Sequence, residues 1–355
     1  MKDRIEKLRR ALRDQSLDGA LITGGVGIRY FSGFTSEDGM VLVTEKELRL
    51  FTDFRYTIQA GEQLAEGFSL TETKAGQEYT MLGEALAACG IERLGFEDAG
   101  MAYAVYTKVL PLVKEMVPFS GALDKLRLIK TPDEIASLQK AQAIADKAYA
   151  ELLTKVRPGM TEREAAAELL YLCGRLGSEG PSFDAIIGSG PNGAMCHAVV
   201  SDRKLQSGDL VVVDFGCVID GYHSDMTRTF GIGSIDAELL QIYDIVREAQ
   251  ALTLDALRAG ISARALDAVA RDYIAARGYG ERFGHGLGHG FGLQIHEAPT
   301  ASARSEETLE SGMTVTIEPG IYLEGKGGVR IEDCCVVREG GHSNLVTSPK
   351  ELVIL

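Results

Sequence analysis

The chain has 355 residues, of which 45% are hydrophobic and 25% charged, so its composition is that of a soluble globular protein with room for two domains. Its formal net charge of −14 at pH 7 argues against a nucleic-acid partner and against an anionic membrane surface, because both require clustered Lys and Arg. Some of the excess carboxylates are candidates for holding metal ions instead.

The N-terminal stretch MKDRIEKLRRALRDQSLDGA has the pattern of a charged amphipathic helix and lacks the apolar core of a secretory signal. No apolar run reaches the roughly 18 residues that a membrane-spanning helix needs. The six cysteines show no C-x-x-C pairing, which is typical of reduced and mostly buried thiols. We therefore expect a cytoplasmic protein.

Residues 1–127 alternate helical and strand-like segments, which predicts a small α/β N-terminal domain. RIEKLRRALRD has helical periodicity, and GALIT, GMVLVT and LRLFTD are short apolar runs of strand length. QEYTMLGEALAACG is again helical and ends at Gly90, a residue type that commonly terminates helices in the left-handed conformation.

The pattern changes at RLIKTPDEIASLQK, and we place the start of a second domain, residues 128–355, at this point. Thr131 and Glu134 have the spacing of a capping box, and Thr161 and Glu164 repeat it, so each pair predicts the start of a helix. Further along, strand pairs alternate with helices expected at about 236–259 and 262–276.

A hairpin in the second domain places two carboxylates together. In DLVVVDFGCVIDGYHSDMTRTF, the dipeptide Asp220-Gly221 is a strong signal for a two-residue turn. Counting outward from that turn places Asp214 opposite Thr227. Asp225 then lies on the same face as Asp214, as a diagonal neighbour roughly 7–8 Å away.

Two carboxylates at this separation repel each other unless a cation lies between them. The alternative is a pair of exposed strand carboxylates, but the Val-Val-Val run before Asp214 indicates a buried strand. GMTVTIEPGIYLEGKGGVRIEDCCVV offers a second pair, with Glu318 at the end of one predicted strand and Glu332 within the next. A buried strand rarely carries a carboxylate without a partner.

Three of the six histidines lie in FGHGLGHGFGLQIHEAP, where every second residue from Gly284 to Gly292 is glycine. If this backbone is extended, the glycine side permits close packing of another segment, and His285 and His289 point into one space together with apolar residues. The residues expected on that side are His285, Leu287, His289, Phe291 and Leu293. His296 breaks the phase, so it reaches the site through a bend or serves elsewhere.

A single histidine is more often structural than a ligand, but three in so short a stretch favour a site. One imidazole with four carboxylates is an oxygen-rich ligand set. Such a set suits a pair of Mn²⁺, Co²⁺ or Zn²⁺ ions better than a structural zinc site. At this point either His285 or His289 could supply the imidazole.

The motifs GDLVVVDFG, GYHSDMTRTF, HGLGHGFGLQIHE, TIEPGIY and GGVRIED together resemble the dinuclear-metal pita-bread peptidases. Within that family they are most similar to Xaa-Pro dipeptidases (prolidases) and Xaa-Pro aminopeptidases, and IRYFSGF and TDFRY resemble the family's N-terminal domain. The resemblance implies an α+β protein in which a small α/β, creatinase-like domain precedes a pita-bread catalytic domain.

The resemblance also implies roles for individual residues. The family's two metal ions correspond here to the ligands Asp214, Asp225, His289, Glu318 and Glu332. The implied catalytic residues are His197, His296 and Glu318, and the implied substrate-binding residues are His285, Arg330 and Phe183. Cys196 stands where many relatives have proline, and the chain has no tryptophan, so it lacks any indole contact that relatives use.

The implied reaction is hydrolysis of the bond between an N-terminal residue and proline by a hydroxide that two divalent metals share. Glu318 would act as general base, and His296 with His197 would stabilise the oxyanion. We expect an Xaa-Pro dipeptidase in which Arg330 binds the substrate carboxylate, with an Xaa-Pro aminopeptidase for longer peptides as the alternative. The resemblance implies a homodimer.

Other classes fit less well. Creatinase-like enzymes and pita-bread binding modules lack the ligand set, and methionine aminopeptidases generally lack an N-terminal domain of this kind. No G-x-S-x-G elbow of a serine hydrolase is present. A dinucleotide site fails because His289 stands where its third glycine should be.

Overall fold

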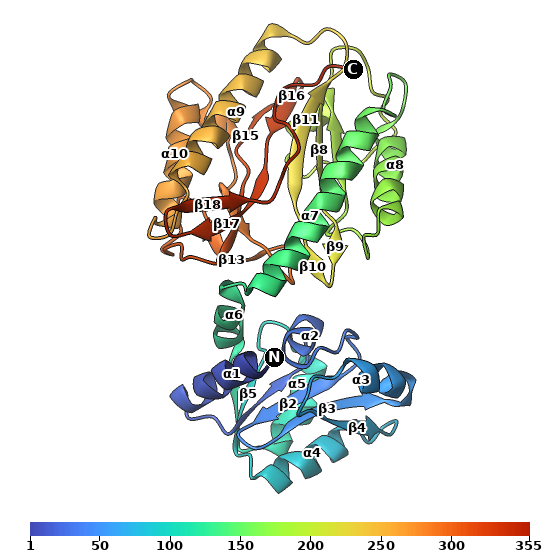
Figure 1. Cartoon of the computed structure of the whole chain (residues 1–355), viewed down its shortest axis with the longest axis vertical. Coiled ribbons are helices and arrows are strands. Elements are labelled where there is room, and N and C mark those ends of the chain that lie inside the picture. The colour runs from blue at the N-terminus through green and yellow to red at the C-terminus, as the bar shows by residue number, and fades with distance from the viewer. The chain divides into compact units, whose positions relative to one another are not determined.

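The computed structural model describes residues 1–355, which divide into two compact units: an N-terminal unit, Met1–Arg127, and a C-terminal unit, Leu128–Leu355 (Figure 1). None of the helices combines the length and the apolar character that spanning a bilayer requires. Each unit has its own hydrophobic core, so the two are described in turn.

The N-terminal unit is built on a mixed six-stranded sheet with the order β4-β3-β2-β1-β5-β6. Its centre, β1, pairs antiparallel with β2 and parallel with β5. The strands are β1 Gly19–Ile22, β2 Met40–Thr44, β3 Leu48–Asp53, β4 Ser69–Thr73, β5 Arg93–Phe96 and β6 Glu115–Pro118. The helices are α1 Lys2–Asp14, α2 Gly25–Ser32, α3 Thr57–Gln63, α4 Glu78–Cys89, α5 Tyr103–Val109 and α6 Ser120–Leu128, with short 3₁₀ turns at Phe54–Tyr56 and Leu110–Leu112.

The helix and strands expected from the apolar runs of this unit are confirmed as α1, β1, β2 and β3. The α4 helix ends as predicted, at Gly90, whose φ of +69° lies in the left-handed region that favours glycine. Leu82 and Leu86 of α4 are fully buried and pack with Leu21 and Leu42 of the sheet.

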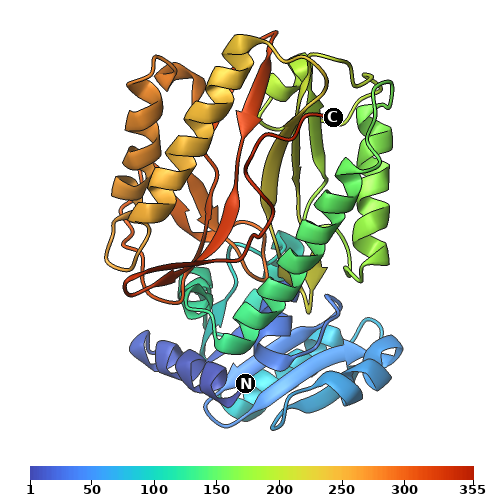
Figure 2. The ribbon, with the colours of Figure 1, turned by 45° about the horizontal axis from the view of Figure 1, so that its top comes forward.

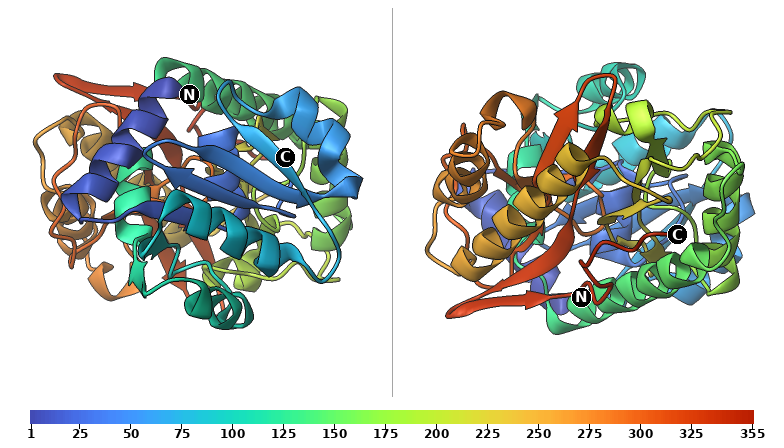
Figure 3. Two further views of the ribbon diagram at one scale, coloured as in Figure 1. Left: turned by 90° about the horizontal axis from the view of Figure 1, so that it is seen from below. Right: turned by 90° about the horizontal axis from the view of Figure 1, so that it is seen from above.

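Four helices frame the C-terminal unit: α7 Pro132–Leu153, α8 Glu162–Arg175, α9 Ala237–Ala256 and α10 Ala263–Ala275. Both predicted capping boxes are present, with Thr131 paired to Glu134 and Thr161 paired to Glu164. The α7–α8 pair, green, and the α9–α10 pair, orange, lie on different sides of the strands (Figures 2 and 3).

The strands of this unit form several small antiparallel sheets. One has the order β11-β8-β7, a second has the order β14-β17-β18, and β9-β10, β12-β13 and β15-β16 are hairpin-like pairs. Their bounds are β7 Ile186–Ser189, β8 Leu210–Phe215, β9 Val218–Ile219, β10 Tyr222–His223, β11 Met226–Gly231, β12 Gly288–Gly290, β13 Glu297–Ala301, β14 Thr314–Ile317, β15 Gly320–Leu323, β16 Gly327–Arg330, β17 Asp333–Arg338 and β18 Gly341–Asn344, with 3₁₀ turns at Gly190–Ala194 and Gly280–Arg282.

Two expectations about these strands were wrong. The stretch GVRIEDCCVV is not one strand, because β16 ends at Arg330 and β17 begins at Asp333, so Glu332 lies in the break between them. The glycine-rich stretch is a strand only over Gly288–Gly290, with a register shift after His289. Leu287 does not share a face with the histidines toward the site, because it is fully buried in the apolar core beside α9 and α10.

Candidate metal centre and active site

A cavity of about 720 Å³ in the C-terminal unit contains all ten residues that the sequence singled out for function. They come from widely separated segments and converge only in the fold. The predicted residues that line it are Phe183, His197, Asp214, Asp225, His285, His289, His296, Glu318, Arg330 and Glu332.

The hairpin that carries two of them has the predicted register. Asp220 and Gly221 form the turn with φ values of +52° and +71°, the conformation for which Asp-Gly is favoured. Thr227 of β11 stands opposite Asp214 of β8, as counted from the turn. Asp214 and Asp225 are 9% and 4% exposed, so neither is a solvated surface carboxylate.

The glycines beside His289 allow its strand to approach β14 unusually closely. A Cβ at Gly288 would overlap the backbone carbonyl oxygen of Thr316. At the same point the His289 N–H donates to the Thr316 hydroxyl at 3.0 Å. The reason predicted for the glycines therefore holds at this position, although at Gly284 a Cβ would meet nothing within 4 Å.

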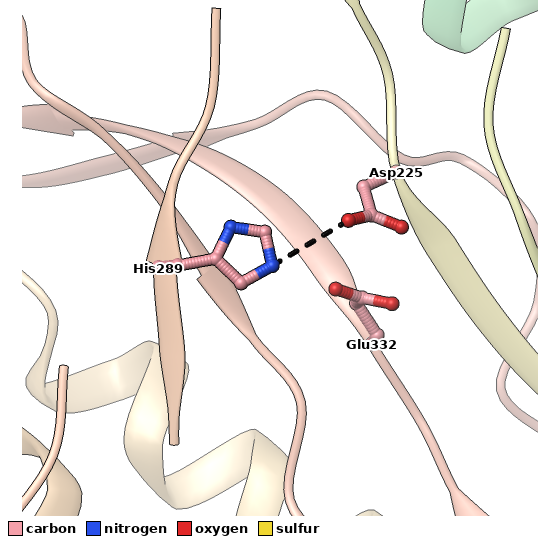
Figure 4. A group of neighbouring side chains, drawn as sticks. All are labelled: Asp225, His289 and Glu332. Carbon is pink, nitrogen blue, oxygen red and sulfur yellow. Dashed lines mark ion pairs between the residues drawn. The ribbon is translucent and has the colours of Figure 1, made fainter. Parts of the chain in front are cut away.

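Asp225, His289 and Glu332 present one ligand atom each, and these atoms lie within 4.8 Å of one another (Figure 4). The His289 Nε2 atom is 3.6 Å from a carboxylate oxygen of Asp225 and 3.5 Å from one of Glu318. Asp225 lies directly before β11, His289 lies in β12, and Glu332 lies in the break after β16. Three chain segments thus supply one cluster of oxygen and nitrogen donors.

The electrostatics of the cluster are unfavourable without a cation. Burial raises the pKa of Asp225 well above its ordinary value, and the neighbouring carboxylates raise it further. Burial likewise raises the pKa of Glu332, again reinforced by like charges. Burial raises the pKa of Glu318 to about 8, with Asp214 adding to the shift against the opposing charge of Arg330.

The donor set fits divalent cations. Asp214 Oδ1 and Asp225 Oδ1 are buried and accept no hydrogen bond from the protein, although buried carboxylate oxygens normally do. Carboxylate oxygens with one imidazole are ligands that Mn²⁺, Co²⁺ and Zn²⁺ accept. Cations would supply the missing partners and remove the repulsion among the carboxylates.

Hydrogen bonds distinguish the two candidate imidazoles. His289 Nδ1 lies 3.0 Å from the Gly290 carbonyl oxygen, so this nitrogen must carry the proton, and Nε2 is left with a lone pair toward the carboxylates. In His285, Nδ1 donates to the Gly286 carbonyl at 2.7 Å and Nε2 accepts from the Tyr322 hydroxyl at 2.9 Å. Both nitrogens of His285 are occupied, so the contacts favour His289 as the ligand.

Burial favours the neutral form of three imidazoles that line the cavity. Burial lowers the pKa of His285 to about 4, with the charge of Arg330 adding to the effect. Burial also lowers the pKa of His289 and of His296. The rings of His289 and His296 meet edge to face with centroids 4.4 Å apart, so His296 does reach the site through a bend. His197 is exposed to the cavity.

Arg330 lines the cavity, but protein groups occupy most of its guanidinium. Its side chain is 4% exposed, and Nη2 donates to Asp214 Oδ2 at 2.5 Å. Nη1 donates to the Tyr322 hydroxyl and to the Cys196 carbonyl, and Nε donates to the Thr227 hydroxyl. Because four of the five N–H groups of a guanidinium are used in this way, the contacts favour a role in holding Asp214 rather than in binding a substrate carboxylate.

Sequence reasoning missed three residues that hold the predicted ones in place. Thr227 donates its hydroxyl to Glu332 Oε2 at 2.7 Å. The Tyr322 hydroxyl links Arg330 to His285, and the Thr316 hydroxyl donates to Glu318 Oε1 at 3.1 Å. Of these three residues, only Thr227 could have been identified from the sequence, because the hairpin register places it opposite Asp214.

Models of known protein families match both parts of the chain. Residues 136–339 match the metallopeptidase family M24, and residues 4–129 match the creatinase/prolidase N-terminal domain. The chain is 38% identical over 356 residues to an Xaa-Pro dipeptidase of Pyrococcus furiosus, covering 99% of this chain and 100% of that protein.

Two solved structures share the whole fold. An Xaa-Pro dipeptidase from Bacillus anthracis has a TM-score of 0.97 at 43% identity, covering 100% of this chain and 99% of the other. An X-Pro aminopeptidase from Thermotoga maritima has a TM-score of 0.92 at 34% identity, covering 99% of each chain. The expected architecture, a small α/β domain followed by a pita-bread catalytic domain, is confirmed. The chain therefore belongs to the M24 metallopeptidase family.

Proposed function

We propose that this metallopeptidase is an Xaa-Pro dipeptidase, which hydrolyses the bond between an N-terminal residue and proline. The observation that carries the proposal is the convergence of four carboxylates and His289 in one cavity. The full-length similarity to Xaa-Pro dipeptidases of P. furiosus and B. anthracis supports the substrate class.

Asp214, Asp225, His289, Glu318 and Glu332 would hold two divalent ions. When bound, such ions supply Lewis-acid chemistry, lowering the pKa of a water molecule toward neutrality and polarising the scissile carbonyl. Glu318 accepts the proton of the attacking water at its carboxylate. Thr316 and Arg330 support this role, because the first donates to Glu318 and the second holds Asp214 beside it.

His296 and His197 donate hydrogen bonds to the oxygen on which negative charge develops. A neutral imidazole can donate from one nitrogen, and burial keeps the pKa of His296 below its ordinary value. An oxyanion donor of this type contributes about 3–4 kcal/mol to catalysis. The bond before proline has no N–H, so a site that requires no donor from the leaving nitrogen accepts it. Phe183 supplies an apolar wall within the cavity.

A second candidate is an Xaa-Pro aminopeptidase that acts on longer peptides. It is favoured by the similarity to the T. maritima structure and by a cavity of about 720 Å³. Because Arg330 donates a hydrogen bond to Asp214, it is less available to bind the carboxylate of a dipeptide than the sequence suggested. Hydrogen bonds from neutral histidines of the cavity would have to hold that carboxylate instead.

The finer features of the proposal are Mn²⁺ or Co²⁺ as the ions, with Zn²⁺ as the alternative, a homodimer, and a cytoplasmic location. The hard, carboxylate-rich ligand set supports the choice of ion. Six unpaired cysteines, four of them buried, support a reducing compartment.

The decisive experiment compares kcat/KM for Leu-Pro, Leu-Pro-Pro and Leu-Ala after chelation and after addition of Mn²⁺ or Co²⁺. We expect no hydrolysis without metal, restored hydrolysis with it, and Leu-Pro to exceed Leu-Pro-Pro. A preference for Leu-Pro-Pro would assign the chain as an aminopeptidase. Equal hydrolysis of Leu-Ala, or full activity of the metal-free protein, would refute the proposal.

A further inference from the structure

Glu332 is held at both its backbone and its side chain, although it lies in a break between two strands. Its N–H donates to the Thr227 carbonyl at 3.1 Å, and its carboxylate accepts from the Thr227 hydroxyl at 2.7 Å. Its carbonyl oxygen accepts from Arg228 Nη1 at 2.6 Å. Two consecutive residues of β11 therefore set where this carboxylate points.

Arg228 is among the largest fully buried side chains of the protein, at 1% exposure. All five of its N–H groups are used, which is the full capacity of a guanidinium. The acceptors are the carbonyl oxygens of Thr227, Glu332, Ser348 and Pro349 and the carboxylate of Asp333.

Asp333 joins the residue after Glu332 to the same network. Its second carboxylate oxygen accepts from Lys350 Nζ at 2.5 Å and from Asn344 at 2.6 Å. Asp333 is fully buried, and Arg228 and Lys350 each place a cationic group against one of its two carboxylate oxygens. The carboxylate is thus ionised and paired on both sides, which a buried charge requires.

The C-terminal segment that supplies two of the acceptors is itself anchored to α7. Asp146 accepts four hydrogen bonds, from the N–H and hydroxyl groups of Thr347 and Ser348, at 2.6–2.9 Å. Asp146 is 9% exposed. The segment, dark red, runs alongside α7 in Figures 1 and 2. A continuous series of contacts therefore leads from α7 through this segment and Arg228 to Glu332.

We propose that Arg228 is a positioning residue for Glu332, and that Asp146 and the Thr347–Lys350 segment tune metal affinity through it. The inference rests on the proposed function, because it takes Glu332 as a metal ligand. Groups that orient a ligand by hydrogen bonding typically contribute 10–100-fold to metal affinity.

Lysine in place of Arg228 would keep the charge but offer only three N–H groups from a single atom, so it cannot serve five acceptors in different directions. The change leaves some buried carbonyls unpaired and frees Glu332 from one constraint. Asparagine in place of Asp146 replaces one of the two accepting oxygens with an NH₂ group, which cannot accept the hydrogen bonds of Thr347 and Ser348. The change weakens the attachment of the Thr347–Lys350 segment and alters no residue that contacts the metal ligands.

The test measures Mn²⁺ binding to the metal-free full chain by calorimetry, with circular dichroism as the check of folding. We expect Arg228→Lys to bind Mn²⁺ roughly 10–100-fold more weakly than the wild type, and Asp146→Asn to bind it several-fold more weakly. Arg203→Lys is the matched control, because Arg203 also makes a bidentate pair with a buried aspartate, Asp209, yet contacts none of the five candidate ligands. It should bind Mn²⁺ as the wild type does.

Wild-type affinity in Arg228→Lys would overturn the inference, as would an equal loss in Arg203→Lys, which would reveal general destabilisation. If Arg228→Lys does not fold, Asp146→Asn decides, and unchanged Mn²⁺ affinity in that variant overturns the inference. Glu332→Gln separates the two levels of proposal. If Glu332→Gln binds Mn²⁺ as the wild type does, Glu332 is not a metal ligand, and both the metal-site assignment and this inference fail. If Glu332→Gln loses Mn²⁺ binding, the metal-site assignment stands, and unchanged affinity in Arg228→Lys then refutes only the positioning role of Arg228.

Discussion

At the scale of single residues, His285 and His289 differ in the atom that each leaves free. His289 keeps Nε2 unprotonated and turned toward Asp225, whereas both nitrogens of His285 are bonded to protein groups. We expect His289→Ala to lose most bound Mn²⁺, and His285→Ala to retain it while losing activity. Metal analysis after Mn²⁺ loading and gel filtration checks both. The opposite pattern would show that the wrong imidazole has been chosen.

His296 lies beside the cluster without belonging to it. His296→Ala should lower kcat for Leu-Pro by about 10²–10³-fold, as expected for loss of an oxyanion donor, with the metal content unchanged. His342→Ala is the control, because His342 lies on β18 and does not line the cavity. A His296 variant that loses metal, or a kcat within a few-fold of the wild type, would argue against the assigned role.

At the scale of elements, the glycine series offers a matched pair of substitutions. A methyl group at Gly288 would collide with the backbone of Thr316, which cannot move without shifting β14. Gly288→Ala should therefore destabilise the C-terminal unit by about 1–3 kcal/mol, as overpacking usually does, and weaken Mn²⁺ binding. Gly284→Ala, with open space around it, should change the free energy of unfolding by less than about 0.5 kcal/mol. Denaturant titration of both variants measures the difference, and equal stability would contradict the close-packing argument.

The same elements show what a sequence can predict. The Asp220-Gly221 turn determines the pairing of Asp214 with Thr227, because the register of a hairpin follows from its turn. The capping boxes of α7 and α8 are equally local. The glycine periodicity of residues 284–292 predicted one extended strand, but only Gly288–Gly290 is a strand. The chain after it turns and brings His296 against His289. The roles of Arg330 and Tyr322 depend on segments that meet only after folding, and no local pattern contains them.

At the scale of the whole molecule, the carboxylate cluster makes stability depend on pH and on metal. In the metal-free protein, Glu318 keeps a proton up to a pKa of about 8, and burial raises the pKa of Asp225 and Glu332 in the same direction. In the unfolded chain these carboxyls lose their protons near their ordinary values of about 4. Between these limits the folded state binds more protons than the unfolded state, so stability falls as pH rises.

We therefore expect the Tm of the chelated protein to decrease as the pH is raised from about 5 to about 8. Over this range the buried carboxyl groups either keep their protons or, once ionised, repel one another. A loss of about 3 kcal/mol would lower the Tm by roughly 6–12 °C. Mn²⁺ should largely abolish this decline, since the ions neutralise the carboxylates that otherwise repel each other. Binding at pH 7 should also release protons, which calorimetry in buffers of different ionisation enthalpy detects. A Tm of the chelated protein that rises with pH over this range, or proton uptake on binding, would mean that the carboxylates are already ionised and compensated without metal. In that case Asp225, Glu318 and Glu332 would belong to a network of ion pairs within the protein and would not form a metal-binding site.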